Sequence, residues 1–376
     1  MPFLRFLLVL LSLFTLPVHA SEPPPALAAR AWLLIDHGSG QVLAAQNPGQ
    51  KVEPASLTKI MTSYLVHAAL RDGKLKRDQV VPVSTKAWKA IGSRMFIEPN
   101  RPVTVDELLH GMVIQSGNDA TIALAEAVAG SEEAFVGMMN AEARRLGLAN
   151  TNYVNATGLP DPAHMTTVED LARLTSALIR DFPADYRLNA VKDYTYNKIK
   201  QPNRNRLLWL DKAIDGVKTG HTEAAGHCLI ASRNDGVRRL TAVVVGTASD
   251  QARVQETLAL LHYGYRAFEA VKLYDKGQAL SQLKVYKSTL ATVGAGFTDA
   301  FVISLPPGAS ASGRLKAEVT SRQPLIAPVR QGDNVAKLRL LLDGKPYGEY
   351  PLVALTAAPV AGPLGRAWDS IKLWLQ

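Results

Sequence analysis

The sequence predicts an α+β fold: a first domain with an antiparallel sheet and helical clusters, then a small all-β sandwich, then a C-terminal amphipathic helix. Three observations predict this order. β-type segments flank a helical middle up to residue 270, short alternating segments split by Gly and Pro follow to residue 355, and a helical pattern closes the chain. The 376 residues, 47% hydrophobic and 20% charged, indicate a folded protein too long for one ordinary core.

The first 20 residues have the pattern of a secretory signal peptide. Arg5 supplies a positive end, Phe6 to Leu16 is an apolar run, and Val18-His19-Ala20 is a small-residue cleavage site. The apolar run is too short to span a bilayer comfortably. We therefore expect the protein to leave the cytoplasm, with residues 21–270 and 271–355 as its folded domains.

Strands are expected at both ends of the first domain and helices between them. β-branched and alternating segments predict strands at 31–36, 41–45, 80–83, 213–222, 226–233 and 238–246. Helical patterns lie at 57–70, from 104 onward, and at 119–128, 132–146, 167–180 and 250–270. Thr104 with Glu107 has the spacing of a capping box, and Asn234-Asp235-Gly236 is typical of a hairpin turn.

The end of the chain, residues 356–376, is expected to be a linker followed by a helix. Residues 356–363 are rich in Ala, Pro and Gly. After them, one helical face carries Leu364, Ala367, Trp368, Ile371, Trp374 and Leu375, and the other is mostly polar. A tethered helix with two tryptophans suits a membrane interface. The alternative is a helix that packs on its own domain.

The segment Pro54-Ala55-Ser56-Leu57-Thr58-Lys59 opens the helix at 57–70 and offers a nucleophile with its base. Lys59 lies three residues after Ser56, on the same helix face. Burial lowers the pKa of a lysine amine, which can then accept the proton of a serine hydroxyl. The same spacing recurs at Ser281-Gln282-Leu283-Lys284, so an N-cap serine and a surface lysine remain the alternative.

A second motif, Ser116-Gly117-Asn118, falls in a loop between two helices, where polar groups are often presented. Ser116 could pass a proton to a leaving amine, and Asn118 could bind the amide of a substrate. The pattern also occurs at Ser232-Arg233-Asn234, and an ordinary turn is the alternative.

A third motif, Lys218-Thr219-Gly220, occurs once and lies on a predicted strand. A strand beside a cleft can pair with an extended peptide, and Gly220 allows that peptide to approach closely. Lys218 adds positive potential, and Thr219 adds a hydroxyl donor for a carboxylate. The alternative is an edge strand protected by its lysine.

In this order and at these spacings, the three motifs resemble those of penicillin-binding proteins and β-lactamases. More narrowly, the chain is similar to the low-molecular-mass D-alanyl-D-alanine carboxypeptidases. The flanking segments that extend the likeness are 54–61, 92–96, 116–120 and 216–222. The resemblance covers essentially the whole mature chain and implies a β-lactamase/transpeptidase-like fold for residues 21–270.

The resemblance implies a serine-type carboxypeptidase that removes the terminal D-alanine from peptidoglycan stem peptides and is acylated by β-lactam antibiotics. Ser56 attacks the peptide carbonyl, Lys59 accepts its proton, and Ser116 relays a proton to the departing D-alanine. The backbone N–H groups of Ser56 and His221 form the oxyanion hole. Arg253 grips the substrate carboxylate. The implied location is periplasmic, on the outer face of the inner membrane.

Several kinds of site are not expected. The sequence has no His-Glu-x-x-His and no ordered Cys/His set, so we expect no metal and no organic cofactor. Cys228 is the only cysteine, which excludes an internal disulfide and suggests a small core residue. The net charge of +9, without a stripe of basic and aromatic residues, favours anionic lipid or wall polymer over nucleic acid.

Three other functions stay open at this point. A secreted class A β-lactamase needs a Glu-x-x-Leu-Asn segment, and Glu169-Asp-Leu-Ala-Arg173 does not fit it. A D,D-endopeptidase is closer, although that branch typically lacks the extra β domain. A non-catalytic wall-binding scaffold could keep the motifs without turnover, but nothing in the sequence favours it.

Overall fold

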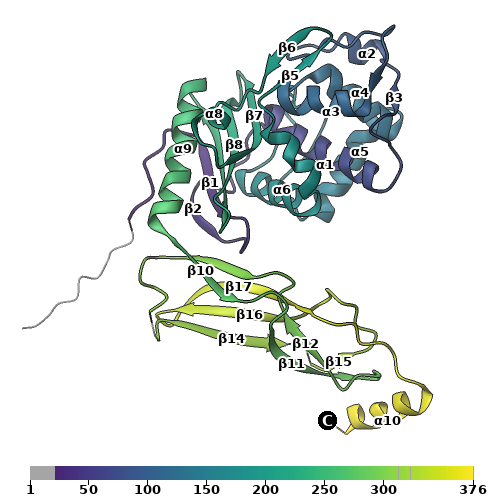
Figure 1. Cartoon of the computed structure of the whole chain (residues 1–376), viewed down its shortest axis with the longest axis vertical. Helices are drawn as coiled ribbons and strands as arrows, with labels where there is room; N and C mark the ends of the chain where they lie inside the picture. Colours follow the sequence, from purple (N-terminus) through teal and green to yellow (C-terminus); the bar gives the residue numbers. More distant parts are fainter. Residues whose placement is uncertain (1–21, 312, 322, 376) are drawn as a thin grey trace, which may run out of the picture.

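The computed structural model describes residues 22–311, 313–321 and 323–375, which form a mixed helix-and-sheet domain followed by an all-β domain (Figure 1). This arrangement confirms the α+β class expected from the sequence. The expected signal peptide, residues 1–20, lies outside the described residues.

The first domain is organised on a five-stranded antiparallel sheet with the strand order β2-β1-β9-β8-β7. The strands are β1 (Ala31–Asp36), β2 (Val42–Gln46), β7 (Ile214–Thr222), β8 (Gly226–Asn234) and β9 (Arg239–Thr247). The helices against the sheet are α1 (Lys59–Arg71), α6 (Val168–Asp181) and α9 (Asp250–Ala267). On β1, Leu33 and Ile35 join the core with α1 and α6, whereas Trp32 and Leu34 join the core with α9. Both faces of the sheet are therefore covered.

A second core lies among helices on the α1 side of the sheet. α3 (Val105–His110) begins with the expected capping box, in which Thr104 Oγ1 accepts from Glu107 N and Thr104 N donates to Glu107 Oε2 at 2.8 Å. α4 (Asn118–Ala129) is buried along its first two turns, between α1 and α3. Other elements of this domain are α2 (Thr85–Trp88), α5 (Glu132–Arg145), α7 (Pro183–Tyr186), α8 (Leu207–Leu210), β3 (Val80–Val81) and β4 (Val103–Thr104).

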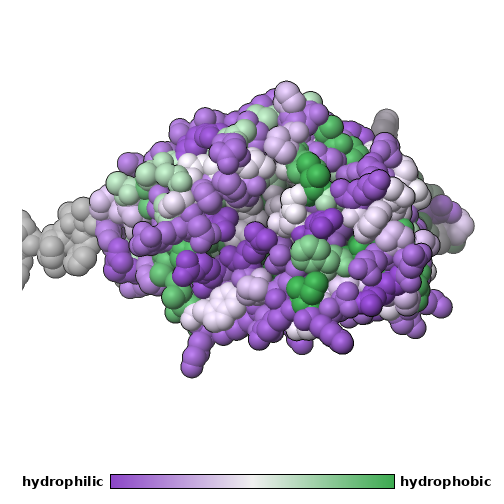
Figure 2. Space-filling view, turned by 90° about the horizontal axis from the view of Figure 1, so that it is seen from above, coloured by the Kyte–Doolittle hydropathy of each residue, from purple (hydrophilic) through white to green (hydrophobic). Residues whose placement is uncertain are grey.

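Apart from the short elements α2, α7, α8 and β4, which the sequence patterns did not mark, two features of this domain differ from the sequence expectation. The helix expected over 250–270 ends at Ala267, because Glu269 already begins the first strand of the second domain. A hairpin, β5 (Asp193–Tyr196) with β6 (Ile199–Pro202), was not expected. Its turn residues Asn197 and Lys198 both have positive φ, as a tight primed turn requires, but the pair lacks the glycine that signals such turns. Figure 2 shows the end of the molecule that carries this hairpin as mostly hydrophilic surface with small hydrophobic patches.

The second domain is a sandwich of a six-stranded sheet, in the order β14-β16-β17-β12-β11-β15, and the pair β10-β13. Ile303 from the pair and Leu338 from the larger sheet share one core, as a sandwich requires. The strands are β10 (Glu269–Tyr274), β11 (Ala279–Tyr286), β12 (Thr292–Gly296), β13 (Phe301–Leu305), β14 (Leu315–Ser321), β15 (Leu325–Ile326), β16 (Asn334–Leu342) and β17 (Lys345–Ala354).

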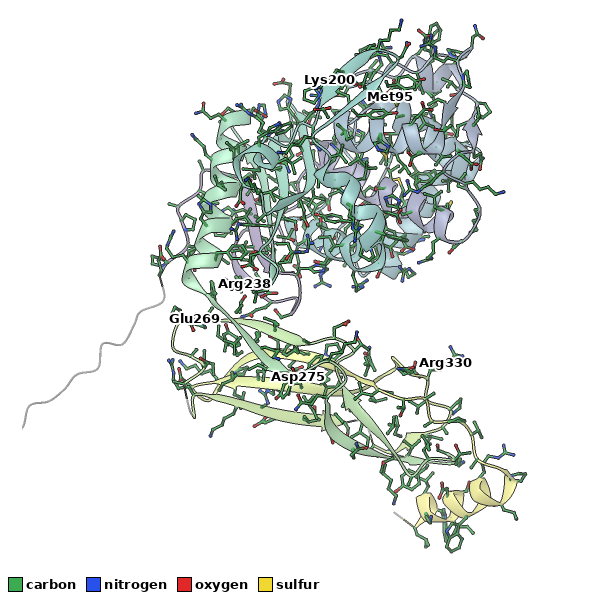
Figure 3. All side chains as sticks on the ribbon, viewed as in Figure 1. Met95, Lys200, Arg238, Glu269, Asp275 and Arg330 are labelled. Carbon is green, nitrogen blue, oxygen red and sulfur yellow. The ribbon has the colours of Figure 1, made fainter. Side chains whose placement is uncertain are left out.

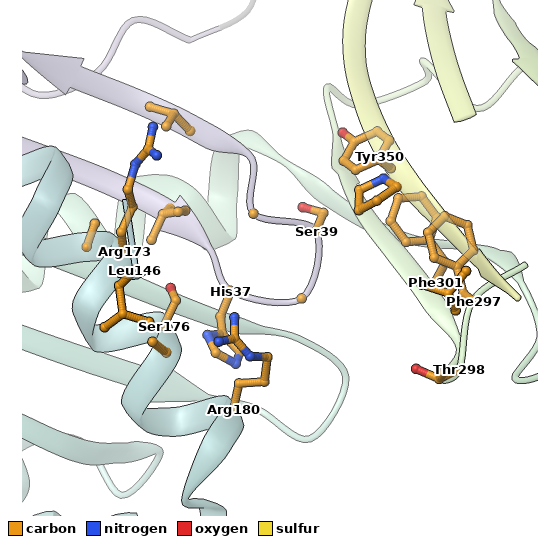
Figure 4. A pocket seen from close by; sticks show the side chains of 18 of the residues that line it. His37, Ser39, Leu146, Arg173, Ser176, Arg180, Phe297, Thr298, Phe301 and Tyr350 are labelled. Atoms are coloured by element: carbon orange, nitrogen blue, oxygen red, sulfur yellow. The ribbon is translucent and has the colours of Figure 1, made fainter. Parts of the chain in front are cut away.

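The side chain of Arg238 lies at the junction of the two domains, near the start of β10, and makes hydrogen bonds there (Figure 3). Its guanidinium donates to Ser304 Oγ at 2.9 Å and to the Phe268 carbonyl at 2.7 Å. Ser304 Oγ donates in turn to Asp36. A cavity of about 670 Å³ lies between the domains, with Arg180 on one wall and Phe301 on the other (Figure 4).

The C-terminal helix α10 (Pro363–Trp374) lies at the far end of the second domain from the first (Figure 1). The backbone N–H of Lys287 donates to Asp369 at 2.6 Å and ties the helix to the sandwich. Its apolar side chains are uncovered, with Leu364 88% and Trp374 85% exposed. Among the described residues, none of the helices combines the length and the apolar character that crossing a membrane requires.

Candidate active site

Ser56 lies on a turn that leads directly into a buried helix. Ala55–Thr58 form a single 3₁₀ turn, and α1 follows without a break. Ala55 has φ 47°, in the left-handed region that residues with a Cβ rarely adopt. Thr58 Oγ1 donates to the Ala55 carbonyl at 2.8 Å and so holds this turn. The side chain of Ser56 is partly exposed on a fixed backbone.

Lys59 is 1% exposed, and its amine is surrounded by three oxygens. Nζ lies 3.1 Å from Ser56 Oγ, 2.6 Å from Asn118 Oδ1 and 2.7 Å from the Thr157 carbonyl oxygen. Burial, followed by the charge of Arg204, lowers the pKa of Lys59 to about 7. A neutral amine has two N–H bonds and one lone pair. Asn118 Oδ1 and the Thr157 carbonyl accept hydrogen bonds from the two N–H groups. The lone pair is then left to accept a hydrogen bond from the Ser56 hydroxyl.

The Ser116-Gly117-Asn118 loop reaches Lys59 through the break between two helices. Gly111–Gln115 form a π-helical turn, and Ser116 has φ 66°, so the chain changes direction before α4 begins. Asn118 accepts from Lys59 and donates through Nδ2 to the Ile91 carbonyl at 2.7 Å. The Ser116 hydroxyl is buried and has no hydrogen-bond partner within the described residues. It is therefore available to a bound substrate.

Lys218 and Thr219 are both buried on β7, one of the two edge strands of the sheet. Lys218 Nζ donates to the Thr219 carbonyl at 3.1 Å. Burial, followed by the charge of Lys59, lowers the pKa of Lys218 well below its usual value. Lys218 and Lys59 also line one small cavity of about 10 Å³, which places the second lysine beside the first.

Gly220 brings β7 directly against the nucleophile turn. A Cβ built on Gly220 would lie 3.2 Å from Ser56 N and 3.2 Å from Ala55 Cβ, so a larger residue would push the strand away. His221 follows at the exposed end of the strand and stacks on His227, with 4.0 Å between ring centroids. The backbone groups of Ser56 and His221 therefore lie at the same edge of the site.

Arg253 is buried in the first turn of α9, behind β7. Its Nη1 donates to the Gly220 carbonyl at 3.0 Å, and its other end pairs with Asp250. Its Nε is buried without a hydrogen-bond partner among the residues that the structure describes. The guanidinium thus supports the end of β7 and keeps one unused donor.

The structure brings the nine predicted site residues to one place. Hydrogen bonds or close packing join Ser56, Lys59, Asn118, Gly220 and Arg253 directly. The other four are chain neighbours of these on the loop and on β7: Ser116, Lys218, Thr219 and His221. Three segments that are distant in sequence therefore meet around the turn that carries Ser56 and around the Lys59 amine.

Two groups that surround Lys59 in the site were not predicted from the sequence. The Thr157 carbonyl is a backbone group, and any residue could supply it. Arg204, which lies beyond the β5–β6 hairpin, donates to the Gln115 carbonyl at 3.1 Å, and its charge lowers the pKa of both Lys59 and Lys218. No motif marks Arg204, since only the fold places it beside the lysines.

The described residues contain no cluster of three or more His, Cys, Asp or Glu side chains placed to hold a metal ion. The site instead combines a hydroxyl, an amine of lowered pKa, free donors and several positive charges. Such a site can form and break an ester on Ser56 and attract an anionic group.

Comparisons with known sequences agree on the identity of both domains. The family model described as D-alanyl-D-alanine carboxypeptidase matches residues 18–249, and that of the penicillin-binding protein 5 C-terminal domain matches residues 268–359. D-alanyl-D-alanine carboxypeptidase DacC of Escherichia coli (strain K12) is 42% identical over 358 residues, covering 93% of this chain and 89% of the relative.

Solved structures extend the similarity to the whole fold. Penicillin binding protein 5 from Haemophilus influenzae has a TM-score of 0.79 and 38% identity, covering 90% of this chain and 99% of that chain. Penicillin-binding protein D2 from Listeria monocytogenes, solved in an ampicillin-bound form, has a TM-score of 0.60 and 29% identity, covering 65% of this chain and 100% of that chain. The resemblance seen in the three motifs is confirmed, and the chain belongs to the D-alanyl-D-alanine carboxypeptidase family of serine hydrolases.

Proposed function

We propose that this protein removes the terminal D-alanine from peptidoglycan stem peptides ending in D-Ala-D-Ala, through an ester on Ser56. The observation that carries the proposal is the 3.1 Å contact between Ser56 Oγ and the buried Lys59 amine. Because the pKa of Lys59 is lowered to about 7, a large share of this amine is neutral near neutral pH and can accept a proton.

In the acylation step, Ser56 Oγ bonds to the carbonyl carbon of the penultimate D-alanine while its proton passes to Lys59. The backbone N–H groups of Ser56 and His221 donate to the resulting oxyanion. The C–N bond then breaks as the Ser116 hydroxyl gives its proton to the nitrogen of the departing D-alanine. Lys59 passes its extra proton to Ser116 and so restores the hydroxyl.

In the deacylation step, water attacks the ester carbonyl and loses a proton to Lys59. The Ser56–carbon bond then breaks, and Ser56 Oγ takes the proton back from Lys59. Each step returns the Lys59 amine to its neutral form, so Lys59 can act as the base in both acylation and deacylation.

Substrate binding is proposed to use the edge of β7 and the positive charges around it. An extended peptide can pair with the strand at Thr219 and Gly220, and the Asn118 carboxamide can bind its amide. The terminal carboxylate meets the Thr219 hydroxyl and the positive potential of Arg204 and Arg253. A penicillin presents the amide carbonyl of its β-lactam ring and a carboxylate on the fused ring in a similar arrangement, which supports acylation by these antibiotics.

One observation favours a carboxypeptidase over a class A β-lactamase. Glu169 pairs with Arg173 at 2.7 Å and lines the cavity between the domains. It therefore does not hold a water molecule at Ser56, which deacylation in those β-lactamases requires.

Attachment to the outer face of the inner membrane is proposed for α10. The exposure of Leu364, Trp368 and Trp374 supports it, because these side chains are not covered by the sandwich. Deleting residues 363–376 should release the protein from membranes without changing turnover. Sedimentation with vesicles checks this, and a truncated protein that still sediments would refute the assignment.

The main test compares D-alanine release from a peptide ending in D-Ala-D-Ala with turnover of a chromogenic cephalosporin. We expect rapid release, slow cephalosporin turnover, and a penicilloyl group on Ser56 by mass spectrometry. A label on another residue, or cephalosporin turnover exceeding release, would refute the proposal.

A further inference from the structure

A buried hydrogen-bonded chain lies behind the nucleophile turn, on the side away from β7. Its two side chains are Thr58 and His164, which are 0% and 2% exposed. Neither side chain has a part in the mechanism above. Both are nonetheless connected to the peptide group that carries Ser56 N–H.

The hydrogen bonds of this chain run in one direction. The Val154 backbone N–H donates to His164 Nδ1 at 3.2 Å, so Nδ1 carries a lone pair and the ring proton is assigned to Nε2. Nε2–H donates to Thr58 Oγ1 at 2.9 Å, and the Thr58 hydroxyl donates onward to the Ala55 carbonyl at 2.8 Å. Burial lowers the pKa of His164 to about 4, which keeps this neutral form at neutral pH.

The last acceptor of the chain fixes the direction of a catalytic donor. The Ala55 carbonyl and the Ser56 N–H belong to one trans peptide group, in which they point in opposite directions. Holding the carbonyl toward Thr58 therefore holds the N–H on the opposite side. Ala55 has φ 47°, so this orientation is strained and depends on contacts that maintain it.

A backbone contact supports the same carbonyl. A Cβ built on Gly158 would lie 1.7 Å from the Ala55 carbonyl oxygen, so the loop around Gly158 leaves no room for a side chain there. The Ala55–Ser56 peptide group thus packs against Gly158. Its direction is fixed by the hydrogen bond from Thr58, and His164 orients the Thr58 hydroxyl.

We propose that Thr58 and His164 are positioning residues, which hold the Ala55–Ser56 peptide so that the Ser56 N–H points at the developing oxyanion. The inference deepens the proposed function and rests on it. Because the two side chains lie behind the turn and the oxyanion exists only along the reaction, their loss should lower the acylation rate constant and leave substrate binding nearly unchanged.

The first experiment compares Thr58→Val with Thr58→Ser in the full chain, using single-turnover acylation by a fluorescent penicillin. Valine keeps the volume and loses the hydroxyl, whereas serine keeps the hydroxyl. Removing an oxyanion-hole donor costs about 10²–10³-fold, so misdirecting one in Thr58→Val should slow acylation roughly 10–100-fold. Thr58→Ser should stay within about threefold of the wild type. The dissociation constant of the non-covalent penicillin complex, taken from the concentration dependence of the acylation rate, should stay within about twofold for both variants.

The second experiment compares His164→Gln with His164→Leu and decides the matter if Thr58→Val does not fold. Glutamine can place an N–H near the position of Nε2, and leucine cannot. We expect the acylation rate constant of His164→Gln to stay close to that of the wild type. The rate constant of His164→Leu should fall by about the same factor as that of Thr58→Val. The double variant Thr58→Val/His164→Leu should be no slower than the slower single variant, because both act through one chain.

The readouts separate this role from a merely structural one and from failure of the proposed function. The final amount of bound penicillin counts folded, active molecules, whereas the rate constant reports each active molecule. A lower final amount at an unchanged rate constant in Thr58→Val and His164→Leu would overturn the inference, as would equal slowing by Val and Ser. If the wild type forms no acyl-enzyme on Ser56, the proposed function itself fails.

Discussion

Ser56-Leu57-Thr58-Lys59 and Ser281-Gln282-Leu283-Lys284 share one spacing but lie in different secondary structure. The first spans a helical turn, in which residues three apart share a face. The second lies inside β11, where residues three apart point to opposite faces. Lys59 is buried and reaches Ser56 Oγ, whereas Lys284 is exposed, with its amine 4.7 Å from the Tyr286 ring centroid.

The difference shows that the reactive lysine depends on other parts of the chain. Asn118 and Thr157, which accept from Lys59, are 59 and 98 positions away in the sequence. Ser232-Arg233-Asn234, the second match to the loop motif, lies on β8, where Ser232 Oγ accepts from Arg239 at 2.6 Å. A short motif therefore has chemical meaning here only where distant segments complete it.

The largest difference between the two Ser-x-x-Lys segments should come from removing each serine. Ser56→Ala should abolish penicillin labelling and lower D-alanine release by at least about 10⁴-fold, because the acyl-enzyme cannot form. Ser281→Ala should leave both unchanged. Gel fluorescence with a labelled penicillin measures this, and any label retained by Ser56→Ala would place the nucleophile elsewhere.

Removing each lysine should give the next largest difference. Lys59→Met keeps the length of the side chain without the amine and should slow acylation about 10²–10⁴-fold, the usual contribution of a general base. Lys284→Met should acylate at the wild-type rate. Stopped-flow acylation measures both variants, and similar rates would show that Lys59 is not the base.

Two glycine variants test whether the contact between the Gly158 loop and the turn that carries Ser56 contributes to stability. Gly158→Ala and Gly40→Ala both place a Cβ on a residue of positive φ, but only Gly158 lies against the Ala55 carbonyl. Strain and overpacking should cost Gly158→Ala roughly 2–6 kcal/mol of unfolding free energy. Gly40→Ala should show only the backbone part, about 1–2 kcal/mol. Urea unfolding compares them, and equal losses would contradict the contact.

The pH dependence of acylation should follow the protonation of Lys59 and not that of Lys284. With a pKa of about 7, Lys59 is neutral above pH 7 and protonated below it. Acylation should therefore rise about tenfold per pH unit up to pH 7 and then level off. Lys284→Met should give the same curve. A rate that continues to rise beyond pH 9 would mean that the amine is charged at rest.

Much of the fold could be predicted because its elements carry local signals. The strands of the main sheet begin and end within one or two residues of the expected positions, and Thr104 and Thr167 cap helices as expected. The β5–β6 hairpin was missed because its Asn197-Lys198 turn lacks a glycine. The end of α9 was missed because the second domain takes up Glu269 as a strand residue.

The sequence alone determined which side chains the site has, their order along the chain, and that Ser56 and Lys59 share a helix face, since one helical turn sets that relation. Only the tertiary structure decided that the Lys59 amine has a pKa of about 7, that the Thr157 carbonyl and Arg204 belong to the site, and that the Ala55–Ser56 peptide is held by Thr58. The physical reason is that burial and Coulomb interactions sum over groups close in space, and most of these groups are far apart in the chain.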